Sequence, residues 1–208
     1  MPSACQFPLE PVSALCSLMP RPLLITGLLI QWLRSHFSRA PNVEDETLRD
    51  TLWAADVSTT GIVIDSVYNW KPEQTDYRPG VFVKRGPWKI LRYGIDDRKM
   101  LGVTQSGNPH YQNFVQGTAV VFCVAQKPAE TEILAAEVYR ELMMFGPRAR
   151  ESFNILRFVV TDVSELSLLE EAAEHYVIAI TCAYGAQHNW EIAKNAPVLK
   201  TLKMTFLP

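Results

Sequence analysis

One long amphipathic helix pattern stands between runs of strand-forming residues, and this arrangement constrains the fold more than any other feature. Within residues 129–145, apolar positions spaced four apart form a single stripe: Leu134, Val138, Leu142. Acidic residues concentrate early in the segment, as the helix dipole favours. Residues 118–125, immediately before it, are almost continuously apolar, which is typical of a strand covered on both faces. We expect a strand, then a helix that ends at Gly146-Pro147.

Strand patterns surround this helix on both sides. β-branched and aromatic residues alternate or cluster in segments 61–68, 81–84, 88–93, 155–163 and 176–184, and a tail segment, 198–207, has the pattern of an edge strand. Residues 85–87 are expected to separate two of these strands, and residues 95–111 to form a long polar loop. Residues 164–174 read as a polar connection or short helical turn, and a short helix is expected from Asn42 or Asp45 to Trp53. Strands around one central helix predict an α+β fold, with a mixed or antiparallel β-sheet packed against one long central helix and an N-terminal helix.

The N-terminal region divides into two parts. Residues 1–20 contain Pro2, Pro8, Pro11 and Pro20, which predicts an extended, Pro-rich arm. Residues 22–33 form the most apolar window of the chain, but they are too few to span a bilayer and carry a helical stripe, so an amphipathic helix is expected. We therefore expect an arm at 1–20 and a single domain at 21–208, without a membrane segment.

Composition weighs against a dedicated nucleic-acid binder. The 208 residues carry 20 Lys and Arg against 22 Asp and Glu, a formal net charge of −2, whereas such binders are strongly basic. A local basic segment is present all the same. Six cations with interleaved Trp88 and Tyr93 fall within sixteen residues: Lys84, Arg85, Lys89, Arg92, Arg98, Lys99. They could contact a nucleic-acid backbone, or they could simply form a solvated cationic hairpin face.

The sequence lacks the signatures of a catalytic or cofactor site. No dinucleotide, phosphate-loop, nucleophile-elbow, zinc-protease or EF-hand motif occurs, so we expect no enzyme activity, cofactor or metal. Cys123 and Cys182 lie in apolar runs, where a free thiol behaves as a small buried hydrophobe, in keeping with a reducing compartment. A thiol nucleophile at Cys182 with His188 as its base would need a turn at Gly185, because six extended residues span about 20 Å.

The order of elements and several local segments resemble the tail terminator, or tail-completion, proteins of tailed bacteriophages. The resemblance covers roughly residues 22–195 and is carried by these segments: PLLITGLLIQWLRSHF, GIVIDSVYNW, RPGVFVKRG, GTAVVFCVAQ with ETEILAAEVYRELMMF, ILRFVVTDVSEL, and EHYVIAITCAYGAQHNWEI. It implies a small α/β fold and a structural role in the virion, with no catalytic residues. The Pro-rich first twenty residues and the segment 94–111 depart from the family pattern, which leaves open a neighbouring neck protein, such as a stopper or adaptor, or a minor tail protein.

The resemblance also implies partners and a location. Such proteins assemble as rings, typically of six copies, that cap the tail tube and join it to the head or neck, so the expected partners are other copies, the tail tube protein and head–tail connector proteins. The expected location is the virion, at the head–tail junction, after synthesis in the host cytoplasm. A closed ring requires a head-to-tail contact between two different faces. An edge between subunits is predicted at Leu199, Leu202, Met204 and Phe206, and the basic segment is predicted to line the lumen and touch passing DNA.

Overall fold

A computed structural model describes residues 24–56, 58–75, 77–91, 99–103, 107–153, 155–169 and 172–191. Its centre is one mixed sheet of seven strands. The strands are β1 (Val63–Ser66), β2 (Gly80–Leu91), β3 (Lys99–Val103), β4 (Pro109–Ala125), β5 (Ile155–Val163), β6 (Ser167–Leu169) and β7 (Ala172–Glu191). Their order is β1-β2-β4-β7-β5, with β3 beside β4 and β6 beside β7. Only the pair β1 and β2 is parallel.

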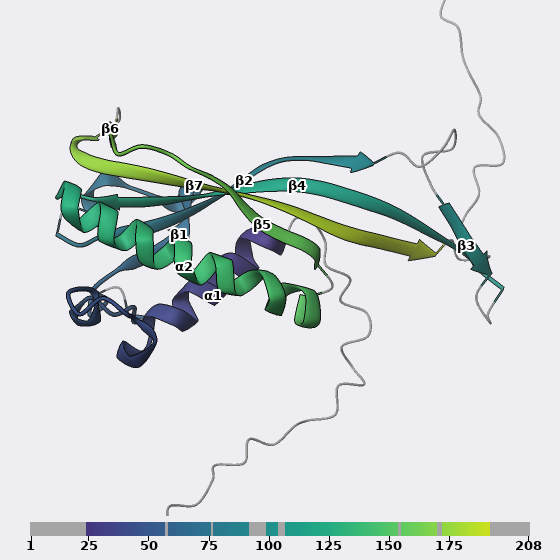
Figure 1. The fold of residues 1–208 in the computed structure, drawn as a ribbon, viewed down its shortest axis with the longest axis horizontal. Coiled ribbons are helices and arrows are strands. Elements are labelled where there is room, and N and C mark those ends of the chain that lie inside the picture. The colour runs from purple at the N-terminus through teal and green to yellow at the C-terminus, as the bar shows by residue number, and fades with distance from the viewer. Residues whose placement is uncertain are drawn as a thin grey trace, which may run out of the picture.

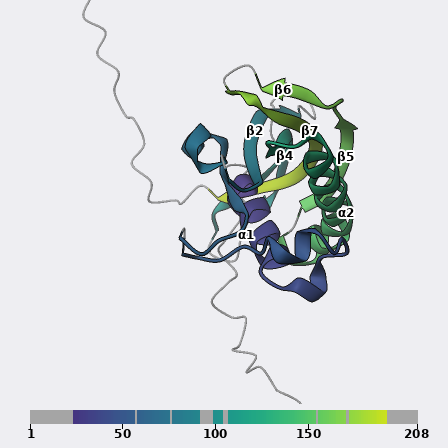
Figure 2. The same ribbon diagram turned by 90° about the vertical axis from the view of Figure 1, so that its left-hand side faces the viewer.

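Two α-helices in the described chain, α1 (Ile25–Phe37) and α2 (Pro128–Phe153), pack against the same side of this sheet (Figure 1). The view from the end shows the strands curving around them (Figure 2). Helix α1 contacts β1 and β2, and α2 contacts β4, β5 and β7. An aromatic cluster joins the layers, because Phe145 of α2 packs edge-on against Trp32 of α1 and Phe158 of β5. The α+β prediction is confirmed.

Alternating side chains of the central strands explain this layering. On β4, Ala119, Val121 and Cys123 point to the helices and are buried. Their partners on β7 are Cys182, Ile180 and Ile178, also buried. Gly117 continues the row, and it must be glycine because a Cβ there would lie 2.5 Å from the Tyr184 ring that covers it. We call this side the helix face and the opposite side the helix-free face.

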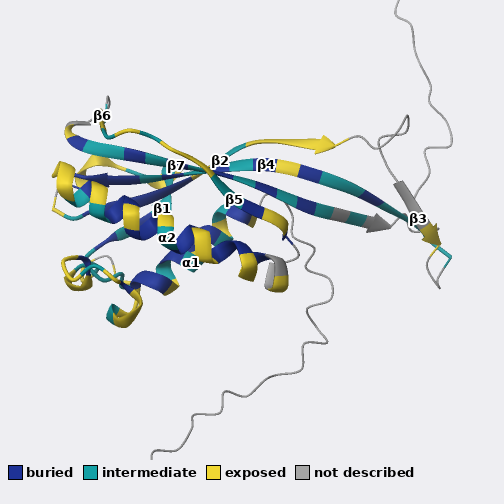
Figure 3. Ribbon diagram, viewed as in Figure 1, coloured by how far each residue is buried: buried dark blue, intermediate teal, exposed yellow. Residues whose placement is uncertain are grey.

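Strands β2, β4 and β7 run past the ends of both helices (Figure 1). We call this part the sheet extension and define it as residues 88–91, 99–103, 109–114 and 187–191. Colouring by burial shows a largely buried body, whereas the extension is mostly half-buried to exposed where its burial is described, with Gln112 an exception at 8% exposed (Figure 3). On β2, Trp88 and Ile90 share the helix face with Val83, yet they are 40% and 48% exposed while Val83 is fully buried.

The helix α2 is longer than predicted. It continues through Gly146 and Pro147 to Phe153, so the expected end at residue 145 is wrong. The last turns bury Ala149 against the sheet, and Pro147 itself faces solvent. Burial of the apolar stripe over β5 therefore outweighs the helix-breaking effect of an interior proline.

Three predictions about the strands also need correction. Residues 95–111 were expected to form a loop, but the described parts contain β3 and the start of β4, which pair with each other. Residues 81–84 and 88–93 were expected to be separate strands, yet β2 is one strand with a bulge between Arg85 and Trp88. Strand β7 is about twice the predicted length. In each case a neighbouring strand supplies backbone hydrogen bonds that no local pattern reveals.

The connections differ in detail from the prediction. The segment from Asn42 to Trp53 contains the short 3₁₀ turn η4 (Leu48–Asp50) in place of an α-helix, and another such turn, η3 (Ala40–Asn42), ends where it begins. Two more, η5 (Val67–Asn69) and η6 (Pro72–Gln74), follow β1. Part of 164–174 forms β6. The N-terminal helix and β5 are confirmed, the latter with its predicted bounds. The arm at 1–20 and the tail strand at 198–207 lie outside the described residues.

Candidate functional site

The basic segment does not form one surface. Lys84 pairs across the sheet with Val120 and Lys89 with Gln116, which places both lysines on the helix-free face. Arg85 pairs with Ala119, on the helix face, and its charge acts on the buried Tyr184 hydroxyl. Alternation along β2 thus sends neighbouring cations to opposite sides.

The remaining cations of the segment are placed only in part. Lys99 belongs to β3, opposite Gln112 of β4, and so lies on the sheet extension. Arg92 and Arg98 lie outside the described residues, as do the four residues of the predicted inter-subunit edge: Leu199, Leu202, Met204, Phe206.

A shallow groove of about 390 Å³ crosses the helix-free face. Its floor is formed by the middle of β7, where Ala183 and Gly185 have little side chain. Apolar walls come from three other strands, with Leu91 on β2, Phe114 on β4, and Leu156 and Val159 on β5. Gln116 and Thr161 add polar groups: the groove is therefore mainly apolar, with hydrogen-bonding atoms along it.

Two cations lie at the same level across this groove. Lys89 pairs with Gln116, Gln116 with Gly185, and Gly185 with Arg157, so these residues form one row across β2, β4, β7 and β5. Three inter-strand spacings separate the outer two, about 14 Å between their backbones. Sequence reasoning missed Arg157, because nothing in the segment 155–163 shows that its third residue faces Lys89 across the sheet.

The described chain leaves both lateral edges of the sheet open. Strand β1 covers β2 only as far as Val83, so residues 84–91 of β2 have a strand on one side alone. On the opposite side of the sheet, β5 pairs with β7 and its outer edge carries no described strand. Exposed hydrophobic side chains accompany these edges: Trp88, Ile90, Leu91 on β2; Leu156, Val163 on β5.

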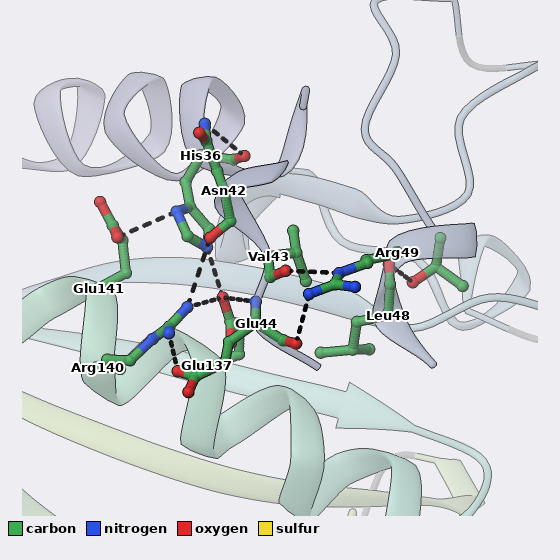
Figure 4. A network of polar contacts seen from close by, with 10 residues as sticks. His36, Asn42, Val43, Glu44, Leu48, Arg49, Glu137, Arg140 and Glu141 are labelled. Atoms are coloured by element: carbon green, nitrogen blue, oxygen red, sulfur yellow. Dashed lines mark hydrogen bonds and ion pairs between the residues drawn. The ribbon is translucent and has the colours of Figure 1, made fainter. Parts of the chain in front are cut away.

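A buried polar cluster joins α1 to α2 (Figure 4). His36 of α1 points between two glutamates of α2: its Nε2 lies 2.7 Å from Glu137 Oε1 and its Nδ1 lies 3.0 Å from Glu141 Oε2. A neutral imidazole has one donor, so two carboxylate partners favour the doubly protonated ring. Burial by itself lowers the pKa of His36, but the hydrogen bonds and charges of Glu141 and Glu137 outweigh it and raise the pKa above 6.5.

The same cluster also holds the segment after α1, residues 43–49, in place through hydrogen bonds and an ion pair. Arg140 of α2 donates from Nη2 to Glu137 Oε1 at 2.6 Å and forms an ion pair with Glu44. The backbone N–H of Glu44 donates to Glu137 Oε1 as well, at 3.3 Å. Arg49 then donates to the carbonyl oxygens of Val43 and Glu44. Sequence reasoning missed the cluster, although Glu137 and Glu141 stand one turn apart beside the buried stripe.

The thiol hypothesis fails on geometry. Cys182 is fully buried on the helix face, and burial raises the pKa of its thiol to about 12. Burial raises the pKa of Cys123 as well. Strand β7 continues through Gly185 without a turn, so the backbones of Cys182 and His188 are about 20 Å apart. A thiol this far from its base and this hard to ionise is a poor nucleophile.

Among the described residues, no group of three or more His, Cys, Asp or Glu side chains is arranged to hold a metal ion. None of the described helices has the length and apolar character needed to cross a membrane.

The arrangement thus offers two open strand edges, an apolar groove with cationic ends, and a sheet that extends beyond its helices, all of which are surfaces for contact. A scan of protein-family models and a search of curated proteins each find no match to this chain.

Proposed function

We propose that this protein is a structural component of a tailed phage, a tail terminator that forms a ring on the tail tube and joins it to the head or neck. The class of protein is the one that the sequence resemblance indicates. The observation that carries the proposal is a pair of strand edges, on opposite sides of one sheet, that no described strand covers. An open edge exposes unpaired backbone N–H and C=O groups and pairs readily with another strand.

The position of these two edges would allow several copies of the protein to close into a ring. Because β2 and β5 differ and lie on opposite sides of the sheet, pairing β2 of one copy with β5 of the next gives a head-to-tail contact. Such contacts form a closed ring when their rotation adds up to a full turn. Pro87 lacks a backbone N–H, so the pairing should concentrate on residues 88–91, after the bulge.

Side-chain exposure supports the same contact. Ile90 is 48% exposed on β2 and Val163 is 45% exposed on β5, although both strands continue into the buried core. Covering such residues at an interface would remove apolar surface from water. The proposed assembly contains about six copies, as in the resembling family, with the tail tube protein and connector proteins as neighbours at the head–tail junction.

Contact with the genome is a secondary part of the proposal. Lys84 and Lys89 share the helix-free face, and a ring would repeat them as a belt of positive charge. Reversing both charges, together with Arg85, should reduce infectivity if this belt meets passing DNA. Unchanged infectivity would count against contact with DNA but would not contradict the proposed ring.

Electron microscopy tests the ring directly. The purified protein is imaged at several concentrations, and virions are imaged for density at the head–tail junction. We expect rings in wild-type samples and their loss in Ile90→Asp, which puts a charge on the proposed edge. Met143→Asp is the matched control, because Met143 is 53% exposed and lies on α2, which is not one of the two edge strands. Monomers at every concentration, with no density at the junction, would contradict the proposal.

A stopper, adaptor or minor tail protein is the alternative within the same class. It would use similar open edges but a different place in the virion. Labelling the chain and locating the label above or at the end of the tail tube separates these roles. The more distant alternative, a cysteine hydrolase, has lost its geometric basis because Cys182 is buried and far from His188 along the strand.

A further inference from the structure

The groove on the helix-free face has no described segment of the chain lying in it, and its chemistry defines what it can bind. Its walls are apolar, from Leu91, Phe114, Leu156 and Val159, and Leu156 in particular is 44% exposed. A groove of about 390 Å³ falls in the size range of sites for short peptides and small ligands. Apolar walls with hydrogen-bonding groups suit an extended peptide better than a bare phosphate chain.

We propose that the groove binds the N-terminal segment of this chain, residues 1–20. This segment carries apolar side chains between its prolines: Phe7, Leu9, Val12, Leu15, Leu18, Met19. Proline restricts the backbone to extended conformations, so less conformational entropy is lost when such a segment binds in a groove. The occupant is defined as this segment, whether it comes from the same copy or from a neighbour.

Length allows the contact. The first described residue is Leu24, directly before α1, and α1 begins beneath the sheet (Figure 1). The 23 residues before it can span at most about 80 Å when extended. The groove lies on the other side of the same sheet, around the open edge of β2, so this reach covers it amply.

Charge selects this segment over the other end of the chain. Lys89 and Arg157 stand at the two ends of one row across the groove. Glu10 is the only charged side chain in residues 1–20, so the segment brings a negative charge to these cations. Residues 192–208 are also apolar but contain three lysines and no acid, Lys194, Lys200 and Lys203, which the same cations repel.

Photo-crosslinking in the full chain tests the proposal. Benzoylphenylalanine replaces Leu156 in the groove, and in a control it replaces Tyr139, which is 41% exposed on α2. Cross-linked peptides are then identified by mass spectrometry. We expect cross-links from position 156 to residues 1–20 and none to that segment from position 139. Cross-links from position 156 only to residues 192–208 or to a folded part of another copy, or none at all, would overturn the proposal.

Thiol labelling gives a second readout that needs no unnatural residue. Cys5 and Cys16 lie in the N-terminal segment, burial protects Cys123 and Cys182 from reagent, and Cys5→Ser in every sample leaves Cys16 as the thiol that is followed. If the groove holds the segment, Leu156→Glu should raise the rate of Cys16 labelling about tenfold, while Tyr139→Glu leaves it unchanged. Equal rates in wild type and Leu156→Glu would overturn the proposal.

Two further experiments distinguish this proposal from nucleic-acid binding and from ring assembly. If position 156 cross-links to an added single-stranded oligonucleotide and, without it, not to residues 1–20, the groove would be assigned to nucleic acid and our proposal would be overturned. The same samples are imaged for rings. Cross-links without rings would support the groove and contradict the assembly, and rings without cross-links would do the reverse, so the two proposals fail independently.

Discussion

The body of the sheet and its extension use the same strands and the same alternation, yet they differ in what covers them. In the body, Val83 on β2 is fully buried beneath the helices. In the extension, Trp88 and Ile90 on the same face of the same strand are 40% and 48% exposed, because neither helix covers this end of the edge strand β2 (Figure 1). Burial is therefore set by the second layer, and the uncovered half is the part available to partners.

This comparison predicts the largest loss of stability in the body. Phe145→Ala removes a fully buried ring that packs against Trp32 and Phe158. We expect the free energy of unfolding to fall by about 4 kcal/mol, from lost transfer energy and the cavity left behind. Denaturant unfolding at a concentration without self-association measures the change, and a loss below about 1 kcal/mol would contradict the layered packing.

The second-largest loss of stability is expected in the polar cluster between the helices. His36→Ala leaves Glu137 and Glu141 without their shared cation in a buried site. Removing one partner of a buried charge pair costs about 3 kcal/mol, since the remaining charges stay desolvated. Ser35→Ala, at an exposed neighbouring position of α1, is the control and should change the stability little. Equal stability of the two variants would show that the cluster does not hold α1 on α2.

The same histidine predicts a dependence of stability on pH. Its folded pKa is raised above 6.5, so the folded state binds the proton more tightly than the unfolded chain. This stabilisation is fully present below pH 6.5 and is lost as the pH rises through the folded pKa, with a slope of at most about 1.4 kcal/mol per pH unit. Unfolding curves from pH 5.5 to 8.5 are compared with those of His36→Gln, which keeps the other three histidines. An identical pH profile in both proteins would refute the assignment.

The extension supplies the smallest predicted change in stability. Ile90→Ala shortens a half-exposed side chain, and we expect the free energy of unfolding to change by no more than about 0.5 kcal/mol. Self-association should weaken all the same, which sedimentation of wild type and variant at matched concentrations would show. A large loss of stability without a change in association would mean that the residue belongs to the body after all.

Much of the fold can be predicted from the sequence. The stripe of Leu134, Val138 and Leu142 and the apolar run at 118–125 predict the central helix and its strand, and β5 has its predicted bounds. These elements succeed because side-chain periodicity records directly which face of an element is buried. The burial of Cys123 and Cys182 is predicted in the same way, because both lie in apolar runs of the sequence.

Only the tertiary structure decided the rest. Helix α2 passes through Pro147 because β5 lies beneath it, and β3 forms because β4 pairs with it. Lys89 and Arg157 share a row only through the register of four strands, and His36 meets Glu137 101 residues away. Periodicity determined which residues turn inward, since it is a local property of the backbone. Which inward and outward side chains meet depends on strand register and helix placement, which arise from contacts distant in the sequence.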